Sequence, residues 1–444
     1  MSNSPPSSRT FVVIGALIGC AALLTCVCVA AAGGAWLFAR PTFAGLPAGV
    51  LGRSAAVNRI AYLGVDGNIH TVRPDGSDPQ ALTTDGGAGP GASRLYRFPT
   101  WSPDGRYVAF IDVKSQGGAT DTQLVAAPVG GGAPQVLHKS GDAQPFYLYW
   151  SPDGRRLAFL ESAGRSLALR LASLGQTDAP SQATGSPFYF VWSPDSRRLA
   201  AHIGGLRNPL SPEARVSLFE PGGSESAPVE EAPALFLAPD WSPDGATIVY
   251  ARRAAAGGGN ELVAADADGA KARSLLSFDG GVSFAWSPTG GHIAYIVSDS
   301  PALEGLGQIA YGKLGVMNPD GSGQRTLGDD SALSFFWSPD GTKLAYLAIN
   351  ADDQGVARLK LTVVDVATGE TRTRALFTPT TGLMSVIPYF DQYLRSMRMW
   401  SPDSKSLVYT AREDGGGSGL YVVDAVSGEP TRIADAVDAA WSWQ

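Results

Sequence analysis

Trp337-Ser338-Pro339-Asp340-Gly341-Thr342-Lys343-Leu344-Ala345-Tyr346 is the stretch that decides the fold, because versions of it recur along most of the chain. Pro presets φ at about −65° in the first central position of a turn, Asp tolerates the second, and Gly accepts a positive φ. The apolar, β-prone residues on either side predict one strand before the turn and another after it. Copies begin at Trp101, Trp150, Trp192, Trp241, Trp286, Trp337 and Trp400, and a shortened copy begins at Trp441.

The last slot of the turn needs a residue that accepts a left-handed backbone. Glycine fills it at Gly105, Gly154, Gly245, Gly290 and Gly341. Ser196 and Ser404 stand there instead in two copies, so we expect those two turns to be slightly more strained.

The spacing of the copies predicts a ring of similar units. Successive tryptophans are 49, 42, 49, 45, 51, 63 and 41 residues apart. A period of about 40–50 residues with four strands per unit is typical of a β-propeller. Runs such as Phe146–Trp150 do not alternate between apolar and polar residues, which predicts strands buried on both faces between stacked blades.

The two ends of the repeat region predict how the ring closes. Arg59–Leu63 matches the strand after the turn, and strands at Asn68–Val72 and Gln80–Thr83 follow it. The sequence ends on a tryptophan strand, Val437–Trp441. We therefore predict an all-β, eight-bladed β-propeller of four-stranded antiparallel blades, in which the N- and C-terminal strands pair within one blade.

The pattern Trp-Ser-Pro-Asp-Gly-x-x-apolar-Ala-aromatic resembles the TolB-type WD40-like propeller repeat, across residues 57–444. Similar repeats form the propeller of dipeptidyl-peptidase-like serine hydrolases. The resemblance implies that the tryptophan-bearing strand is innermost and lines the central channel. It also implies a propeller outside the cytoplasm, since TolB-type propellers are typically periplasmic.

The segment before the propeller predicts a membrane anchor. Residues 1–10 are a short polar tail, residues 11–38 contain no charge over 28 positions, and residues 39–56 form a linker. A spanning helix needs about 20 apolar residues, so residues 11–38 predict a single-pass signal anchor in the cell membrane, preceded by the tail and followed by the envelope-facing propeller. Two alternatives stay open: a cleaved signal peptide that yields a secreted form, and a lipoprotein processed at Cys20.

One long insert is the first candidate for a binding surface. The period from Trp337 to Trp400 is the longest, and its excess lies between Phe377 and Arg398. Long loops on a rigid scaffold often carry function, and the repeat order places this one near a mouth of the channel. The alternative is a lid that packs its own aromatic side chains, with a short helix at Tyr389–Met397.

Seven residues are candidates for ligand or partner contact. The insert supplies Tyr389, Tyr393, Arg395 and Arg398, and a second segment, Gly86–Arg97, supplies Arg94, Tyr96 and Arg97. Gly204–Arg215 is a weaker candidate segment.

The sequence contains few motifs for metal binding, cofactor binding or catalysis. The repeated tryptophans are expected to be core residues and the repeated aspartates turn formers. His70, His138, His202 and His292 fall in four different repeats without metal-ligand spacing, so we expect no metal and no cofactor. We also expect no serine hydrolase activity. The sequence contains no Gly-x-Ser-x-Gly nucleophile elbow, and the repeats occupy residues 57–444, which leaves no segment for a separate α/β hydrolase domain.

Charge argues against nucleic acid as a partner. Residues 57–444 carry 31 basic side chains, the 34 of the chain less Arg9, Arg40 and Arg53, and all 41 acidic ones. The resulting balance of −10 repels phosphate backbones.

Taken together, these features lead us to expect a non-enzymatic, monomeric binding or scaffold module for a protein or an envelope polymer. The alternative is a channel-centred enzyme, a lyase or hydrolase acting on a saccharide, which would need three or more His, Asp, Glu or Arg side chains converging at one channel mouth.

Overall fold

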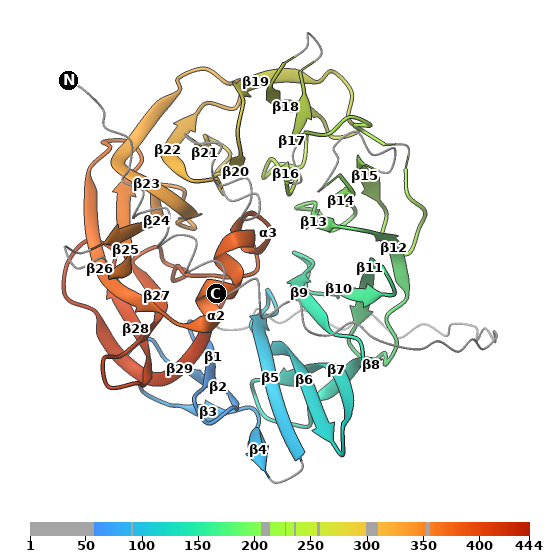
Figure 1. Ribbon diagram of the computed structural model, residues 1–444, viewed down its shortest axis with the longest axis vertical. Helices are drawn as coiled ribbons and strands as arrows, with labels where there is room; N and C mark the ends of the chain where they lie inside the picture. The colour runs from blue at the N-terminus through green and yellow to red at the C-terminus, as the bar shows by residue number, and fades with distance from the viewer. Residues whose placement is uncertain are drawn as a thin grey trace.

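The protein is an all-β molecule whose sheets stand side by side around a common centre (Figure 1). The computed structural model describes residues 57–89, 92–205, 214–226, 228–234, 237–254, 258–298, 310–351 and 356–444. The predicted tail, anchor and linker, residues 1–10, 11–38 and 39–56, lie outside these ranges. Within the described ranges, no helix has the length and apolar character that crossing a membrane requires.

The largest sheet is antiparallel and joins the end of the chain to its beginning. In order across the sheet, its strands are β20 (Val282–Trp286), β21 (Ile293–Val297), β22 (Gly312–Met317), β23 (Arg325–Trp337), β24 (Lys343–Ala351), β25 (Ala357–Asp365), β26 (Thr371–Pro379), β27 (Ser406–Arg412), β28 (Ser418–Asp424), β29 (Thr431–Trp441), β1 (Ile60–Gly64), β2 (Ile69–Val72) and β3 (Gln80–Ala81).

Four smaller antiparallel sheets complete the described part of the ring. The first contains β4 (Gly87–Gly89), β5 (Ala92–Trp101), β6 (Tyr107–Gln116), β7 (Ala119–Pro128) and β8 (Gln135–Gly141). The second contains β9 (Pro145–Trp150), β10 (Arg156–Ala163), β11 (Ser166–Ser173) and β12 (Ser181–Gly185). The third contains β13 (Phe188–Trp192), β14 (Leu199–Ile203) and β15 (Arg215–Phe219), and the fourth β16 (Asp240–Trp241), β17 (Thr247–Arg253), β18 (Asn260–Asp266) and β19 (Arg273–Phe278).

In four of the repeats, at β9, β13, β16 and β20, the strand that carries the tryptophan is an edge strand on the inner side of its sheet, as the resemblance implied. In the second sheet the order is β12-β11-β10-β9, and Trp150 ends β9. Figure 1 shows β9, β13, β16 and β20 near the centre of the ring and β12, β15 and β19 toward its rim.

The tryptophans are core residues that also tie neighbouring inner strands together. All eight repeat tryptophans are at most 8% exposed. In four copies the indole N–H donates to the carbonyl that directly precedes the corresponding inner-strand tryptophan of the previous unit. These bonds join Trp101 to Ala440 (3.1 Å), Trp192 to Tyr149 (3.0 Å), Trp337 to Ala285 (3.2 Å) and Trp400 to Phe336 (2.9 Å).

The Ser-Pro-Asp-Gly turn satisfies its own polar groups. Ser338 donates its hydroxyl to Asp340 at 2.6 Å and accepts the Lys343 N–H at 2.9 Å. The Gly341 N–H donates to the Ser338 carbonyl at 2.8 Å, and Gly341 has φ +69°. The turn therefore needs a residue that tolerates a positive φ in its last slot.

Two serines occupy that slot at positive φ and form a bond that the sequence did not predict. Ser196 and Ser404 both have φ 61°. The Ser196 hydroxyl accepts the Asp153 N–H, and the Ser404 hydroxyl accepts the Asp340 N–H, each at 3.0 Å. Each strained turn is thus bonded to the turn of the preceding unit, which offsets part of the strain.

The first and last described strands pair, as the sequence predicted. β1 and β29 run antiparallel with Ile60 opposite Trp441 and Ala61 opposite Ala440. The Trp441 indole also donates to the Asn58 side chain at 2.8 Å. This pairing holds residues at the two ends of the described chain in one sheet.

Candidate functional site

The long insert folds into short helical turns at the centre of the ring (Figure 1). It comprises α2 (Thr381–Val386), the 3-10 helix η2 (Ile387–Tyr389) and α3 (Phe390–Tyr393). Thr380 caps α2, because its hydroxyl accepts the Leu383 N–H at 3.3 Å. The single helix predicted at Tyr389–Met397 is therefore misplaced, since the helical turns begin earlier and end at Tyr393.

An apolar stripe explains where these turns form. Leu383, Val386, Ile387 and Phe390 follow the spacing i, i+3, i+4 and i+7, and all four are buried. That spacing places them on one helical face. The stripe packs on strands of the largest sheet, and Phe390 meets Phe335 of β23 edge-on, with ring centroids 5.3 Å apart.

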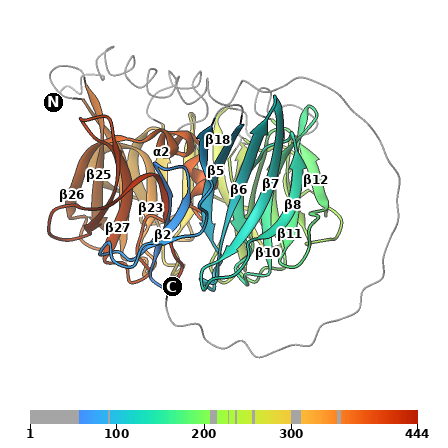
Figure 2. The ribbon, with the colours of Figure 1, turned by 90° about the horizontal axis from the view of Figure 1, so that it is seen from below.

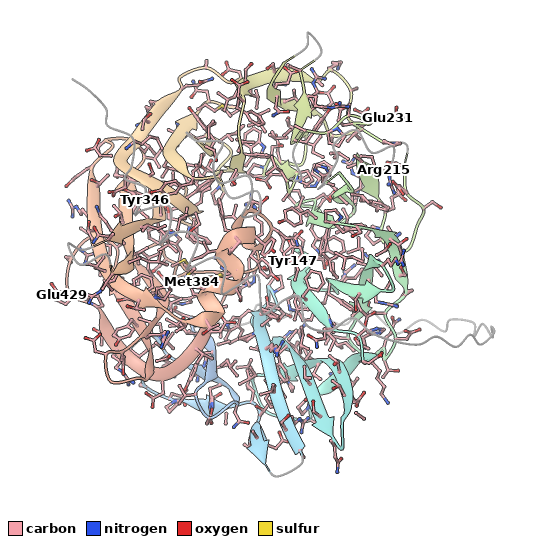
Figure 3. The ribbon with its side chains drawn as sticks, in the orientation of Figure 1. Tyr147, Arg215, Glu231, Tyr346, Met384 and Glu429 are labelled. Carbon is pink, nitrogen blue, oxygen red and sulfur yellow. The ribbon has the colours of Figure 1, made fainter. Side chains whose placement is uncertain are left out.

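The insert lies toward one face of the ring and the C terminus toward the other (Figure 2). α3 contacts β13, β20 and β23, and α2 contacts β29. Tyr147 and Met384 lie near the centre of the ring, whereas Arg215, Glu231 and Glu429 lie at its rim (Figure 3). The insert therefore fills the channel at its own face.

The two predicted tyrosines of the insert have different surroundings. Tyr393 packs against Tyr147, with ring centroids 5.1 Å apart, and against Phe98 at 6.4 Å. Burial raises the pKa of the Tyr393 hydroxyl. Tyr389 is 44% exposed, so it is the more accessible of the two.

Arg395 is held by an aspartate of another blade. Its Nη2 lies 2.6 Å from Oδ2 of Asp240 and 3.4 Å from the Trp286 carbonyl. Asp240 also accepts the backbone N–H of Trp286 at 2.8 Å and that of Trp241 at 3.0 Å. The Asp240 carboxylate thus joins the insert to two inner strands.

Arg398 lies three residues further on and has no such partner. Its guanidinium carbon is 4.3 Å from the centroid of the Trp443 ring. Its Nε–H is buried without a hydrogen-bond acceptor, and the side chain forms no ion pair among the described residues. Burial lowers the pKa of Arg398 to about 10.

A small enclosed cavity lies beside α3. It measures about 10 Å³, and its lining includes Tyr147, Asp240, Asp391 and Arg395. Asp391 accepts the Ala238 N–H at 3.1 Å, and burial raises the pKa of its carboxyl to about 6. The cavity therefore gathers two carboxyl groups and a guanidinium but has room for about one water molecule.

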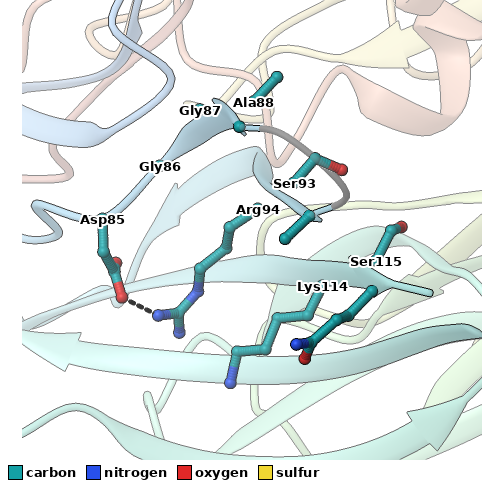
Figure 4. Close-up of a pocket in the computed structure, with 11 residues that line it drawn as sticks. Asp85, Gly86, Gly87, Ala88, Ser93, Arg94, Lys114 and Ser115 are labelled. Atoms are coloured by element: carbon teal, nitrogen blue, oxygen red, sulfur yellow. Dashed lines mark hydrogen bonds and ion pairs between the residues drawn. The ribbon is translucent and has the colours of Figure 1, made fainter.

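The second predicted group lies on β5, next to β4 at the rim of the ring (Figure 1), and Figure 4 shows Arg94 with its partner Asp85. Arg94 forms two bonds to Asp112, at 2.8 and 2.6 Å, and also pairs with Asp85. Tyr96 is buried and donates its hydroxyl to Asp85 at 2.7 Å. Arg97 is exposed on the other side of the strand.

An open groove of about 450 Å³ runs along this part of β4, β5 and β6. Its lining mixes both charges with glycine backbone and hydroxyl groups, and includes Asp85, Gly86, Gly87, Ser93, Arg94, Lys114, Ser115 and Gln116. The weaker candidate segment Gly204–Arg215 is described only at residues 204–205 and 214–215.

No group of three or more His, Cys, Asp or Glu side chains with metal-binding geometry occurs in the part of the chain that the structure describes. Buried His202, for example, meets the backbone of Leu237, with Nδ1 3.1 Å from the carbonyl oxygen. Burial lowers the pKa of its imidazole to about 4.

Sequence reasoning missed Asp240 and Asp391. Asp240 directly precedes Trp241, where the other repeats carry uncharged residues such as Tyr149 and Ala285. That departure from the repeat could have marked Asp240 as a candidate residue. For Asp391, the only indication in the sequence was its place in the insert, between the two predicted tyrosines.

No protein-family model and no curated protein matches this sequence. Solved structures do resemble the fold. A protein described as the eukaryotic initiation factor is 14% identical over 86% of this chain and 98% of that chain, with a TM-score of 0.52. An oligogalacturonate lyase in complex with manganese is 15% identical over 82% of this chain and 95% of that chain, with a TM-score of 0.50.

TolB from Acinetobacter baumannii is also among the similar structures. It is 13% identical over 86% of this chain and 81% of that chain, with a TM-score of 0.39. At such identities these likenesses concern the fold alone, which is a β-propeller.

Proposed function

We propose that this protein is a binding module: an eight-bladed propeller, anchored in the cell membrane by residues 11–38 and lying outside the cytoplasm. In this proposal it recognises a protein or an envelope polymer through its rim, and it is not an enzyme. The uncharged run of 28 residues before the propeller supports the anchor.

The contrast in size between the cavity beside α3 and the groove on β4–β6 is the observation that carries this proposal. The channel cavity beside α3 measures about 10 Å³, because the chain's own insert fills the centre of the ring. The groove on β4–β6 measures about 450 Å³ and opens to solvent. Pockets that hold small molecules usually measure about 300–1,000 Å³, so the rim has room for a ligand and the channel beside the insert does not.

The chemistry of the groove suits a polar, extended ligand. Arg94 is paired with Asp85 and Asp112, so its guanidinium is held in place and its charge is neutralised. It therefore contributes fixed hydrogen-bonding groups to the groove rather than an unpaired positive charge. Lys114 lies 3.6 Å from Asp112 and remains 42% exposed. A protein segment or a polysaccharide chain offers the mixed hydrogen-bonding groups that such a lining accepts.

Site-specific photocrosslinking in native host cells tests the rim. A photoreactive residue at Gln116, in the groove, should capture a discrete partner that the same residue at exposed Glu429 does not capture. Lys114→Glu should weaken that capture, whereas Lys271→Glu, the same charge change elsewhere on the surface, should not. Equal capture from both positions, or none from Gln116, would contradict the proposal.

A reporter enzyme that is active only outside the cytoplasm, fused to the C terminus, tests the topology. An active fusion is expected. An inactive but intact fusion would overturn the extracytoplasmic placement.

A second candidate, an enzyme acting on a saccharide in the channel, draws on one observation. Asp240, Asp391 and Arg395 converge on one cavity, and the Asp391 carboxyl has a pKa of about 6, which suits proton transfer near neutral pH. A sugar ring does not fit unless the insert moves. Product formation from envelope saccharides that Asp391→Asn abolishes would favour this candidate over the binding module.

A further inference from the structure

Two arginines of the insert, Arg395 and Arg398, differ in whether they have a carboxylate partner. Arg395 has a carboxylate partner, Asp240, at 2.6 Å. Arg398 forms no ion pair and no side-chain hydrogen bond among the described residues, and its Nε–H is buried. A partly buried cation without a counter-charge is unfavourable, so proteins usually pair such groups or keep them for a ligand.

The surroundings of Arg398 hold the guanidinium in place without neutralising it. The Trp443 ring lies beneath it at 4.3 Å, a cation–π contact. The Trp443 indole is itself fixed, because it donates to the Trp101 carbonyl at 3.1 Å. The Arg398 backbone is fixed as well, since its carbonyl accepts the Trp441 N–H at 2.9 Å.

This arrangement lies away from the filled end of the channel. Trp443 is the penultimate residue, and the C terminus lies toward the face opposite α2 (Figure 2). Arg398 and Trp443 are both partly exposed. Of the nine tryptophans in the described ranges, Trp443 alone is not buried, so solvent reaches its side chain.

We propose that Arg398 and Trp443 form a binding site for an oxoanion, a carboxylate or phosphate group, that approaches from the face opposite α2. A guanidinium carries planar N–H donors that match the oxygen pairs of these anions. The stacked indole holds the guanidinium so that little side-chain entropy is lost on binding. The inference takes the propeller to be a binding module, but it concerns a site separate from the rim groove.

Thermal unfolding of the full-length protein with simple anions tests the site. Sodium acetate and sodium phosphate are compared with sodium chloride at equal ionic strength and pH. At saturation, acetate, phosphate or both should raise the wild-type Tm by about 2–4 °C above the chloride value. The more effective salt identifies the anion class. If neither anion raises Tm at tens of millimolar, the proposal is wrong.

Three variants separate a ligand site from a structural role. Arg398→Met should melt at or above the wild-type temperature in chloride, because it removes an unpaired, partly buried charge, and should lose the anion-dependent shift. Arg398→Lys should keep a reduced shift. Arg155→Met, which removes an exposed arginine of a repeat turn, should respond like the wild type. An Arg398→Met variant that keeps the full shift, or that melts several degrees lower in chloride, would overturn the proposal.

Iodide quenching of tryptophan fluorescence gives a second readout. Iodide is an anion, so it should quench Trp443 more strongly than neutral acrylamide does, and acetate should compete with it. Arg398→Met and Trp443→Phe should both remove the acetate-sensitive fraction. Quenching that acetate does not change would contradict the site, while leaving the crosslinking test of the rim groove unaffected.

Discussion

The guanidinium of Arg395 lies 2.6 Å from the carboxylate of Asp240, although 155 positions separate the two residues in the chain. This pair fastens the insert to the inner strand of another sheet. The same carboxylate accepts the backbone N–H of Trp286, so it also joins two neighbouring inner strands. The insert is therefore built into the centre of the ring rather than laid over it.

Breaking this pair should destabilise the protein. Asp240→Asn leaves Arg395 without its counter-charge, and Arg395→Met leaves Asp240 unpaired, so each change should lower the free energy of unfolding by about 2–3 kcal/mol. The double variant should lose less than the sum of the two single losses. Urea unfolding measures all four proteins, and single losses below about 0.5 kcal/mol would show that the pair is not a structural link.

The pH dependence of stability should report on Asp391. Burial raises the pKa of its carboxyl to about 6, so the native state holds this proton more tightly than the unfolded state does. The free energy of unfolding should therefore fall as the pH rises from about 4 to 6, and at pH 7 the buried charge costs up to about 3 kcal/mol.

Asp391→Asn removes that charge and keeps an acceptor for the Ala238 N–H. Its stability gain over the wild type should be near zero at pH 4 and about 1–3 kcal/mol at pH 7. Asp414→Asn, at an exposed carboxylate, is the control and should show little change at either pH. A gain that does not depend on pH would contradict this origin.

The serine in the left-handed slot of the turn should respond differently to two small substitutions. Ser404 has φ 61°, and its hydroxyl accepts the Asp340 N–H at 3.0 Å. Ser404→Ala keeps the strain and loses the bond, so it should cost about 1 kcal/mol. Ser404→Gly also loses the bond but relieves the strain, and should cost less. Chemical denaturation measures both. An alanine variant as stable as the wild type would contradict the bonding role, and an alanine variant as stable as the glycine variant would contradict the strain.

The closure of the ring should depend on the last strand. Deleting residues 437–444 removes the partners of Ile60 and Ala61 and the buried Trp441. Loss of that tryptophan alone should cost about 3–5 kcal/mol, so the truncated protein should unfold at a much lower temperature or fail to fold. The circular dichroism melting curve decides this, and a normal melting curve would show that β1 does not need β29.

Much of this architecture could be predicted because it repeats. Each copy of the Trp337–Gly341 sequence contains the same turn residues and a core tryptophan. The local structure of one copy therefore predicts that of the other copies. The pairing of β1 with β29 followed from noticing that the first strand matches the middle of a repeat. The hydroxyl bonds of Ser196 and Ser404 did not follow, because they depend on the distance between turns of adjacent units.

The site was harder to predict because it depends on contacts between distant residues. Arg395 and Arg398 are both arginines of one insert, and only the folded ring shows that one is paired and the other is not. Tyr393 was a candidate for ligand contact, with a lid that packs its own aromatic side chains as the alternative, and it packs against Tyr147. The apolar spacing from Leu383 to Phe390 is visible in the sequence and would have placed the helical turns correctly.

Amide hydrogen exchange of the insert in the full-length protein tests the central claim, that the insert is a folded part of the core that fills one end of the channel. The Met384, Leu394 and Met397 N–H groups donate within the insert, to Thr380, Phe390 and Tyr393 carbonyls. They should therefore exchange about as slowly as the amides of the inner strands β9 and β20. Exchange within seconds in the insert, while β9 and β20 stay protected, would contradict the claim and reopen the channel as a site for a ligand.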